Sequence, residues 1–254
     1  MSGEPSEAMV GALGERLEFR PPPRPDHTPL VGRRVVLAAV DPDRDAEPLY
    51  AASHSPTGDP AIWTYLFDGP YPDAPALREA LGRMAASDDP LFYTILTGTQ
   101  RAPQGMASYL RITPEHGVIE IGNIWFGVAL QRTPAATEAI YLLARHAFDE
   151  LGYRRLEWKC NALNQPSRRA AERFGFGFEG VFAQHMVVKG CNRDTAWYAI
   201  TDRRWPAVRA AFEAWLSPEN FSADGRQRRR LAELRTEAAS ETGAEGRRGI
   251  EAGR

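Results

Sequence analysis

The sequence predicts a domain of the α/β class, built as a mixed sheet with helices on both faces. Segments with strand-like and helix-like patterns alternate along residues 34–216, which is typical of layered α/β architectures. The segment at 118–128 is apolar on both faces, as expected of a central strand that is covered on both sides. The segment at 134–151 repeats apolar residues at helical spacing along one side. Together these patterns favour one folded domain with a buried sheet.

In the first half of the domain, two helices separate the first strand from the others. A helix is predicted at 42–52 because Asp41 is a good N-terminal cap for it. A second helix is predicted at 73–86 from a stripe of leucine, alanine and methionine at helical spacing. The predicted strands of this half are 34–40, 92–96, 107–112 and 118–128.

The second half begins with the helix at 134–151, and Gly152 follows where a helix end favours a residue with positive φ. A strand and a short helix come next. Two further strands are expected to be joined through 190–194, and a last helix closes the domain. In order, these elements are a strand at 155–160, a helix at 167–174, strands at 178–189 and 195–201, and a helix at 205–216.

The two ends of the chain are expected to lie outside the folded domain, which is predicted to span 31–218. Residues 1–30 contain a run of prolines and little apolar periodicity, so they are expected to form a flexible leader. Residues 219–254 alternate arginine and glutamate among small residues, which predicts a charged tail that is disordered or partly helical. Arg228-Arg229-Arg230 could contact RNA, but the glutamates that follow favour a solvated tail.

Composition excludes several classes of function. The chain has 254 residues and a formal net charge of −2, so it has no bulk attraction to nucleic acid or to an acidic membrane surface. No segment approaches the roughly 18 apolar residues of a membrane helix, and the N-terminus lacks the pattern of a secretory signal. Cys160 and Cys191 are too far apart for a metal or redox motif, so no metal is expected. We therefore expect a cytoplasmic protein.

The residues that open the helix at 134–151 form a candidate anion-binding site. Thr133 is a good N-cap, and Pro134 suits the first helical position because an amide there would have no partner. The other amides of the first turn point outward at the positive end of the helix dipole, where a pyrophosphate could bind. By itself, the pattern is more often that of an ordinary, well-capped helix.

Glu120 stands out because it is a carboxylate inside an apolar strand. Burying an unpaired carboxylate costs several kcal/mol, so such a residue usually has a partner or a chemical role. A carboxylate in an apolar setting also suits the work of a general base. Two interpretations therefore stay open: a catalytic base that acts through water, and a structural ion pair with an arginine.

One motif resembles the GNAT superfamily of N-acyltransferases, whose loop before the corresponding helix reads Gln/Arg-x-x-Gly-x-Gly/Ala. Gln131-Arg132-Thr133-Pro134-Ala135-Ala136 keeps the spacing, the first glutamine and the last small residue. It departs from the family at Pro134, which takes the first glycine position. Proline can neither donate an amide hydrogen bond nor adopt positive φ, so the identity of the acyl donor stays open.

Two further motifs carry the same resemblance. Asn164-x-x-Ser167 is followed by Arg173-Phe174-Gly175-Phe176, and Glu120-Ile121-Gly122 is similar to the Rim-type ribosomal-protein alanine/serine acetyltransferases. The resemblance covers about residues 30–217 and implies the GNAT fold, with a mixed and mostly antiparallel sheet. It also implies acetyl-CoA, or another acyl-CoA, as the co-substrate. Members of the family often pair as homodimers.

The resemblance implies roles for residues along these motifs. Glu120 is the expected catalytic base. Ser167, or a water that it holds, is expected to protonate the leaving thiolate, because the usual tyrosine position is Ala171. The alternative for Ser167 is that it caps the short helix. Backbone amides near Phe126 and Val128 would polarise the acyl carbonyl. The residues expected to bind the cofactor are Phe126, Val128, Gln131, Arg132, Thr133, Ala135, Ala136, Thr137, Asn164, Ser167 and Arg173.

The acceptor is expected to bind between the N-terminal half and the late pair of strands. Aromatic and acidic side chains together suit a ligand that carries an amine, and Asp68 could hold its positive charge. Packing in the core is the alternative for Trp63 and Tyr65. Cys160 is not expected to be a nucleophile, because no histidine stands in a suggestive position beside it. The expected acceptor residues are Trp63, Tyr65, Asp68, Trp125 and His185.

The sequence thus predicts an acetyl-CoA-dependent N-acetyltransferase in which a primary amine attacks the donor directly. Its acceptor is expected to be a small-molecule amine or a protein N-terminus, with the small molecule slightly favoured. One alternative is a related transferase of a natural-product pathway that takes its acyl group from aminoacyl-tRNA. Another is a non-catalytic domain that binds acyl-CoA for regulation, which the missing tyrosine at Ala171 would permit.

Overall fold

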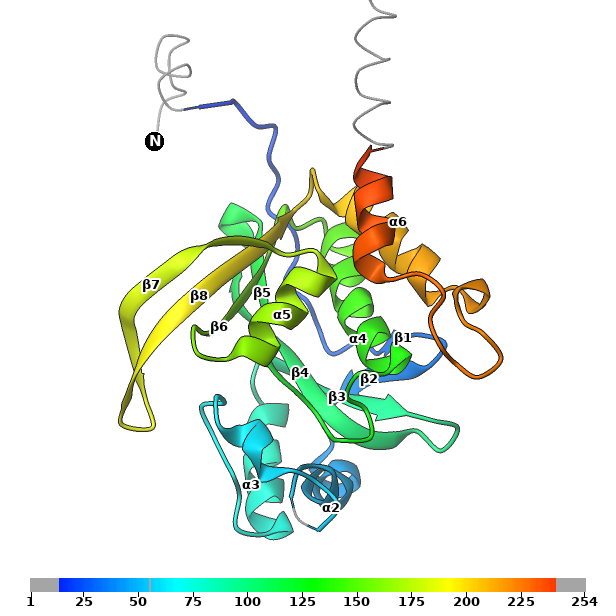
Figure 1. The fold of residues 1–254 in the computed structure, drawn as a ribbon. Helices are drawn as coiled ribbons and strands as arrows, with labels where there is room; N and C mark the ends of the chain where they lie inside the picture. Colours follow the sequence, from blue (N-terminus) through cyan, green and yellow to red (C-terminus); the bar gives the residue numbers. More distant parts are fainter. Residues whose placement is uncertain (1–13, 55, 241–254) are drawn as a thin grey trace, which may run out of the picture.

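The computed structural model describes residues 14–54 and 56–240, so the predictions for residues 1–13 and 241–254 lie outside the described part. Its centre is an eight-stranded sheet with the order β1-β2-β3-β4-β5-β6-β8-β7 (Figure 1). The strands are β1 Leu30–Val31, β2 Val35–Ala39, β3 Leu91–Thr97, β4 Ala102–Thr113, β5 Val118–Phe126, β6 Arg155–Asn161, β7 Gly177–Val188 and β8 Cys191–Thr201. The α-helices are α2 Pro42–Ser53, α3 Ala74–Ala85, α4 Pro134–Arg145, α5 Gln165–Phe174 and α6 Trp205–Leu216. Short helical segments are η1 Pro60–Trp63, η2 Pro114–His116, η3 His146–Glu150 and η4 Pro218–Asn220.

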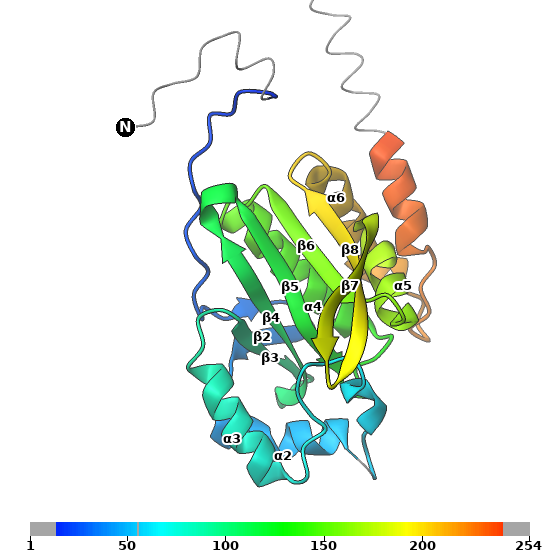
Figure 2. The same cartoon turned by 90° about the vertical axis from the view of Figure 1, so that its left-hand side faces the viewer.

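The layers of the fold match the predicted architecture. Neighbouring strands are antiparallel except β5 and β6, which run parallel. Helices α4, α5 and α6 share the main hydrophobic core with one face of the sheet, whereas α2 and α3 enclose a second core near β4 (Figure 1 and Figure 2). Successive residues of β4 show the alternation that a strand requires, because Met106 faces the second core and Ala107 the first. The mixed, mostly antiparallel sheet with helices on both faces is confirmed.

The connection between the last two strands is tighter than predicted. Lys189 and Gly190 alone form the turn, with φ values of 50° and 74°, so the prediction of a link through 190–194 is wrong. Two consecutive residues with positive φ make the kind of turn that matches the twist of a hairpin. Arg193 therefore belongs to β8 rather than to a loop.

Parts of both ends pack against the domain. Residues 14–29 have no regular secondary structure, but Arg24 Nη1 donates a hydrogen bond to the Ile112 carbonyl oxygen, 2.9 Å away. Residues 231–240 are helical and carry two buried leucines of the main core. Within the described part, the core therefore extends past the predicted domain boundary at 218.

Glu138 joins the β1–β2 turn to helix α4. Its buried carboxylate accepts hydrogen bonds from the backbone N–H groups of Arg33, Arg34 and Val35, at 3.1, 2.6 and 3.1 Å. The Arg34 guanidinium also lies 3.9 Å from this carboxylate. These contacts hold two arginines beside the first turns of α4.

We expect the Glu138→Ala variant to lose about 2 to 4 kcal/mol of unfolding free energy, because three backbone amides lose a charged acceptor. Urea denaturation followed by circular dichroism measures this loss. The matched control is Glu79→Ala, which removes an exposed ion pair with Arg83 and should change the unfolding free energy by less than about 0.5 kcal/mol. Equal losses in the two variants would contradict the proposed anchoring role of Glu138.

Candidate functional site

Strands β5 and β6 part at their C-terminal ends. Their parallel ladder ends at the Ile121–Trp158 pair, although both strands continue. Beyond that pair β5 contains a bulge, in which Asn123 and Ile124 together oppose Ala107 of β4. Asn123 has a left-handed φ of 51°, a conformation that asparagine tolerates better than most residues. Because a bulge bends its strand, the last residues of β5 have no partner on β6.

The loop after β5 leads into α4, whose first turn has the predicted cap. Thr133 Oγ1 accepts a hydrogen bond from the Ala136 amide at 3.2 Å, and Pro134 is the first residue of the helix. The amides of Arg132 and Ala135 make no hydrogen bond to any residue that the structure describes. Unpaired amides at the positive end of a helix can receive an anion, so this position can bind a phosphate.

Other predicted residues of this loop hold its shape. Gln131 Nε2 donates to the Phe126 carbonyl oxygen at 2.9 Å, so this side chain braces the loop. The amide of Gly127 is taken by the Gln104 carbonyl oxygen at 2.7 Å. Val128 is exposed, and its amide has no partner within the described residues. Of the amides expected to polarise an acyl carbonyl, that of Val128 is therefore available.

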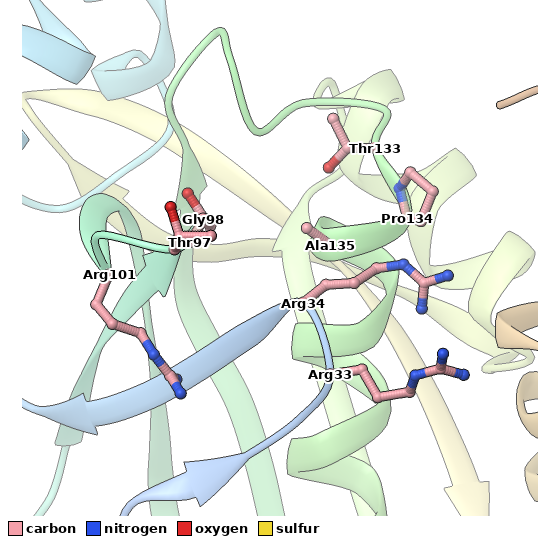
Figure 3. A pocket seen from close by; sticks show the side chains of 9 residues that line it. Arg33, Arg34, Thr97, Gly98, Arg101, Thr133, Pro134 and Ala135 are labelled. Atoms are coloured by element: carbon pink, nitrogen blue, oxygen red, sulfur yellow. The ribbon is translucent and has the colours of Figure 1, made fainter. Parts of the chain in front are cut away.

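A pocket of about 650 Å³ lies beside the start of α4 and is rich in arginine. Figure 3 shows Arg33 and Arg34 of the β1–β2 turn beside α4, whereas Arg101 of the β3–β4 turn stands on the opposite side of the pocket from the helix. Arg34 Nη1 donates a hydrogen bond to the Leu216 carbonyl oxygen at 3.3 Å. The guanidinium groups of Arg33 and Arg101 make no hydrogen bond or ion pair with any residue that the structure describes. Sequence reasoning missed these residues because they lie far along the chain from the helix start. The full lining is Arg33, Arg34, Thr97, Gly98, Thr99, Arg101, Thr133, Pro134 and Ala135.

The second motif lies at the start of α5, across the parted strands. Asn164 is the N-cap of α5, because its side-chain oxygen accepts a hydrogen bond from the Ser167 amide at 3.1 Å. The alternative that Ser167 caps this helix is therefore wrong. Trp158 Nε1 donates to Ser167 Oγ at 3.0 Å, and the Ser167 hydroxyl is in turn hydrogen-bonded to the Cys160 thiol. Burial raises the pKa of the neighbouring Cys160 thiol, which makes it a poor nucleophile.

Glu120 lies in a cluster of paired charges on the face of the sheet opposite the main core. The residue is only 2% exposed, and its Oε2 accepts from Arg111 Nη1 at 2.7 Å and from Lys159 Nζ at 3.0 Å. Lys159 also contacts Glu157 at 2.7 Å, and its ammonium lies 3.8 Å from the centre of the Trp197 ring. The predicted ion pair with an arginine is thus present, and a lysine that the sequence reasoning did not name shares it.

The second oxygen of Glu120 remains available. Oε1 accepts no hydrogen bond from any described residue, because both cations contact Oε2. A Cβ atom at Gly122 would lie 3.6 Å from Oε1 and 2.8 Å from Leu110 Cδ2, so Leu110 packs beside the glycine on that side of the oxygen. One oxygen fixed by cations and one free oxygen are compatible with a base that acts through water.

The structure does not bring Thr137 and Arg173 to the exposed amides. Arg173 Nη1 donates to Thr137 Oγ1 at 3.1 Å, and its guanidinium lies 4.9 Å from the centre of the Trp215 ring. Burial lowers the pKa of the Arg173 guanidinium. Both side chains contribute to the packing of α4, α5 and α6 against one another.

Two of the predicted acceptor residues are core residues. Trp63 and Trp125 are buried in the second core, with ring centroids 5.3 Å apart. Trp125 shares a face with Glu120, although their spacing in a regular strand would place them on opposite faces. The bulge at Asn123 adds one residue to β5, and this extra residue returns Trp125 to the face that carries Glu120. The packing alternative therefore holds for Trp63.

The other acceptor residues lie on two segments that contact each other. Lys189, at the tip of the β7–β8 hairpin, donates to the Trp63 and Gly69 carbonyl oxygens at 2.8 Å each and to the Asp68 carbonyl oxygen at 3.4 Å. The Asp68 side chain is exposed, and the Tyr65 hydroxyl donates to the Leu163 carbonyl oxygen at 3.4 Å.

On the hairpin, His185 Nδ1 lies 2.9 Å from Thr195 Oγ1. This places His185 and the 63–69 loop on the same side of the molecule as the free Glu120 oxygen.

Within residues 14–54 and 56–240, the structure contains no group of three acidic, histidine or cysteine residues arranged to hold a metal ion. The same part of the chain contains no helix long and apolar enough to cross a membrane.

Comparison with known proteins gives a consistent result. Residues 34–177 match the family described as Acetyltransferase (GNAT) domain. The structure is similar to a GCN5-related N-acetyltransferase from Brucella melitensis, with a TM-score of 0.83 and 45% sequence identity, over 86% of this chain and 99% of that one. It is also similar to a proposed GNAT-family acetyltransferase from Chromobacterium violaceum, with a TM-score of 0.69 and 36% identity, over 81% of this chain and 98% of that one.

A shorter match connects the chain to a curated relative. YdaF of Bacillus subtilis, named as a proposed ribosomal N-acetyltransferase, is 30% identical over 101 residues. The match covers 40% of this chain and 55% of YdaF, so it spans about half of that relative's length.

Proposed function

Because this chain belongs to the GNAT family of acetyltransferases, we propose that it transfers the acetyl group of acetyl-CoA to a primary amine. The observation that carries this proposal is the start of α4, where unpaired amides adjoin a pocket that Arg33 and Arg101 help to line. Acetyl-CoA is dianionic at its diphosphate and carries an activated acyl group as its thioester.

The residues present fit such a donor. The amides of Arg132 and Ala135 would hold the diphosphate, and Arg33 and Arg101 offer cations to further phosphate oxygens. Asn164 uses its side-chain oxygen as a helix cap, so its amide NH₂ remains to hold the pantetheine arm. Pro134 has no amide hydrogen to offer to the diphosphate, but the amides of Arg132 and Ala135 lie on either side of it in the chain.

Glu120 and Ser167 supply the proton transfers in this proposal. Glu120 Oε1 accepts the proton of the incoming amine, directly or through water, while Arg111 and Lys159 hold Oε2 in place. Ser167, whose oxygen is fixed by Trp158, holds a water that gives its proton to the departing thiolate, and the resulting hydroxide is reprotonated from solvent. A direct attack by the amine needs no enzyme nucleophile, and the raised pKa of the Cys160 thiol fits that requirement.

The acceptor is the primary amine of a small molecule or of a protein N-terminus. YdaF is named as a proposed ribosomal N-acetyltransferase, which supports including a protein acceptor in the test. The tail arginines give little support to a tRNA donor, because Arg229 is paired with Glu237 and Arg230 with Glu233.

The test is a thiol-release assay with acetyl-CoA and a panel of amines that includes peptides beginning with serine or alanine. We expect thiol release that depends on the acceptor, with one acetylated amine formed for each thiol. A parallel reaction with aminoacyl-tRNA should form no amide. Absence of acetyl-CoA binding together with amide formation from tRNA would overturn the proposal.

A further inference from the structure

Arg193 is a buried arginine on the same sheet face as the Glu120 cluster. It is only 7% exposed. Thr195 and Trp197 follow it at every second position of β8, so the three side chains lie on the same face of the sheet. Trp197 in turn covers the ammonium of Lys159, which contacts Glu120. Sequence reasoning missed Arg193 because the residue was expected in a loop, although this alternation of polar and aromatic residues was a usable signal.

The charge of Arg193 has no partner among the described residues. It makes no ion pair there, and its Nε lacks any hydrogen-bond partner. Its guanidinium lies 5.0 Å from the centre of the Phe67 ring. Lys159, which is also buried, instead contacts two carboxylates. A buried cation without an anion is strongly unfavourable, so a structural role alone does not explain Arg193.

The position of Arg193 places it at the acceptor side of the proposed active site. Phe67 belongs to the 63–69 loop, which Lys189 ties to the β7–β8 hairpin. Burial lowers the pKa of the Arg193 guanidinium. Among its charged neighbours, Arg111 lowers this pKa further, whereas Glu120 raises it. Arg111, Lys159 and Arg155 are matched in this cluster by three carboxylates, those of Glu120, Glu157 and Glu179, so the positive charge of Arg193 is left over.

We propose that Arg193 binds an anionic group of the acceptor, so that the preferred substrates are primary amines that also carry a carboxylate or a phosphate. The anion would complete the charge pairing at Arg193, while the amine end of the same molecule reaches the free oxygen of Glu120. This inference rests on the proposed function and narrows its substrate class. Arginine suits the task because its planar guanidinium can donate two parallel hydrogen bonds to either anion.

The experiment compares matched acceptors that differ only in charge. Amino acids with one to five carbons between amine and carboxylate are assayed beside their primary amides, and O-phosphoethanolamine beside ethanolamine. We expect kcat/KM for the best anionic acceptor to exceed that of its neutral counterpart by at least about 30-fold, as a buried charge-assisted pair would give. The carboxylate and phosphate arms identify which anion the site prefers.

The Arg193→Gln variant should lose this preference. Its kcat/KM for the anionic acceptor should fall to the level of the neutral one, while the neutral acceptor changes by less than about threefold. The control is Arg203→Gln, which removes an exposed arginine in the turn after β8 and should keep the full preference. Equal rates for acids and amides in the wild-type protein would overturn the inference, as would an equal loss for both in Arg193→Gln.

A binding measurement decides the inference even if no amine is acetylated. With CoA at saturation to fill the donor site, inorganic phosphate should raise the melting temperature of the wild-type protein above that in chloride of equal ionic strength. Arg193→Met should show no such rise, and without ligand it should melt about 2 to 4 °C above wild type because an unpaired buried charge is gone. A lower melting temperature of Arg193→Met, or an undiminished phosphate effect, would assign Arg193 a purely structural role.

Discussion

Replacing Glu120 with glutamine should lower kcat by about 10²- to 10⁴-fold, the usual contribution of a positioned general base. Glutamine keeps the size of the side chain and an oxygen for Arg111 and Lys159, but it cannot accept the proton of the amine. The KM for acetyl-CoA should stay within about threefold, because the proposed donor site lies at the start of α4, away from Glu120. Steady-state thiol release with one fixed amine measures both constants.

Glu157→Gln is the matched control for this variant. Glu157 lies opposite Glu120 on β6 and contacts the same lysine, but both of its oxygens are already occupied, by Arg155 and Lys159. Its replacement disturbs the charge cluster without removing a free oxygen, so kcat should fall by less than about tenfold. If the two variants lose kcat equally, Glu120 serves the cluster as an ion-pair partner and is not the base.

Replacing Ala135 with aspartate should weaken CoA binding by at least about 30-fold in calorimetry. The new carboxylate would occupy the unpaired amides of the first turn and would repel the phosphates of the ligand. The same carboxylate interacts favourably with the helix dipole, so the free energy of unfolding should stay equal or rise by about 0.3 to 1 kcal/mol. A loss of binding without a loss of stability separates a ligand site from a simple helix cap.

Ala207→Asp places the same residue in the first turn of α6, far along the chain from the arginine pocket. It should affect stability in the same direction and leave the affinity for CoA unchanged. Unchanged affinity in Ala135→Asp as well would mean that the phosphates bind elsewhere, and the proposed donor site would then be incorrect.

The two helix starts of the proposed donor site could be predicted from the sequence because their signals are local, whereas the arginines of the pocket could not. A capped helix start needs only Thr133 and Pro134, and the cap of α5 needs only Asn164 and the residues after it. The order of strands and helices followed for the same reason, since the periodicity of each element is visible within a short window. These predictions do not require knowledge of which strands are neighbours.

The acceptor half depends on contacts that a linear pattern does not contain. Trp125 reaches the face of Glu120 only because Asn123 forms a bulge, and no local rule announced that extra residue. The pairing of Glu120 with Lys159 arises from the parallel alignment of β5 and β6, across a helix that separates them in the chain. Arg193 became a strand residue because the hairpin turn takes two residues instead of five.

Lys159 and Lys189 are the only lysines of the chain, and the ammonium group of each is fully engaged. One contacts two carboxylates, and the other is surrounded by three carbonyl oxygens of the 63–69 loop. An activated thioester modifies lysines only when their amine is neutral and accessible. An enzyme built in this way offers its own donor few side chains to consume, so spontaneous self-acetylation should compete little with turnover.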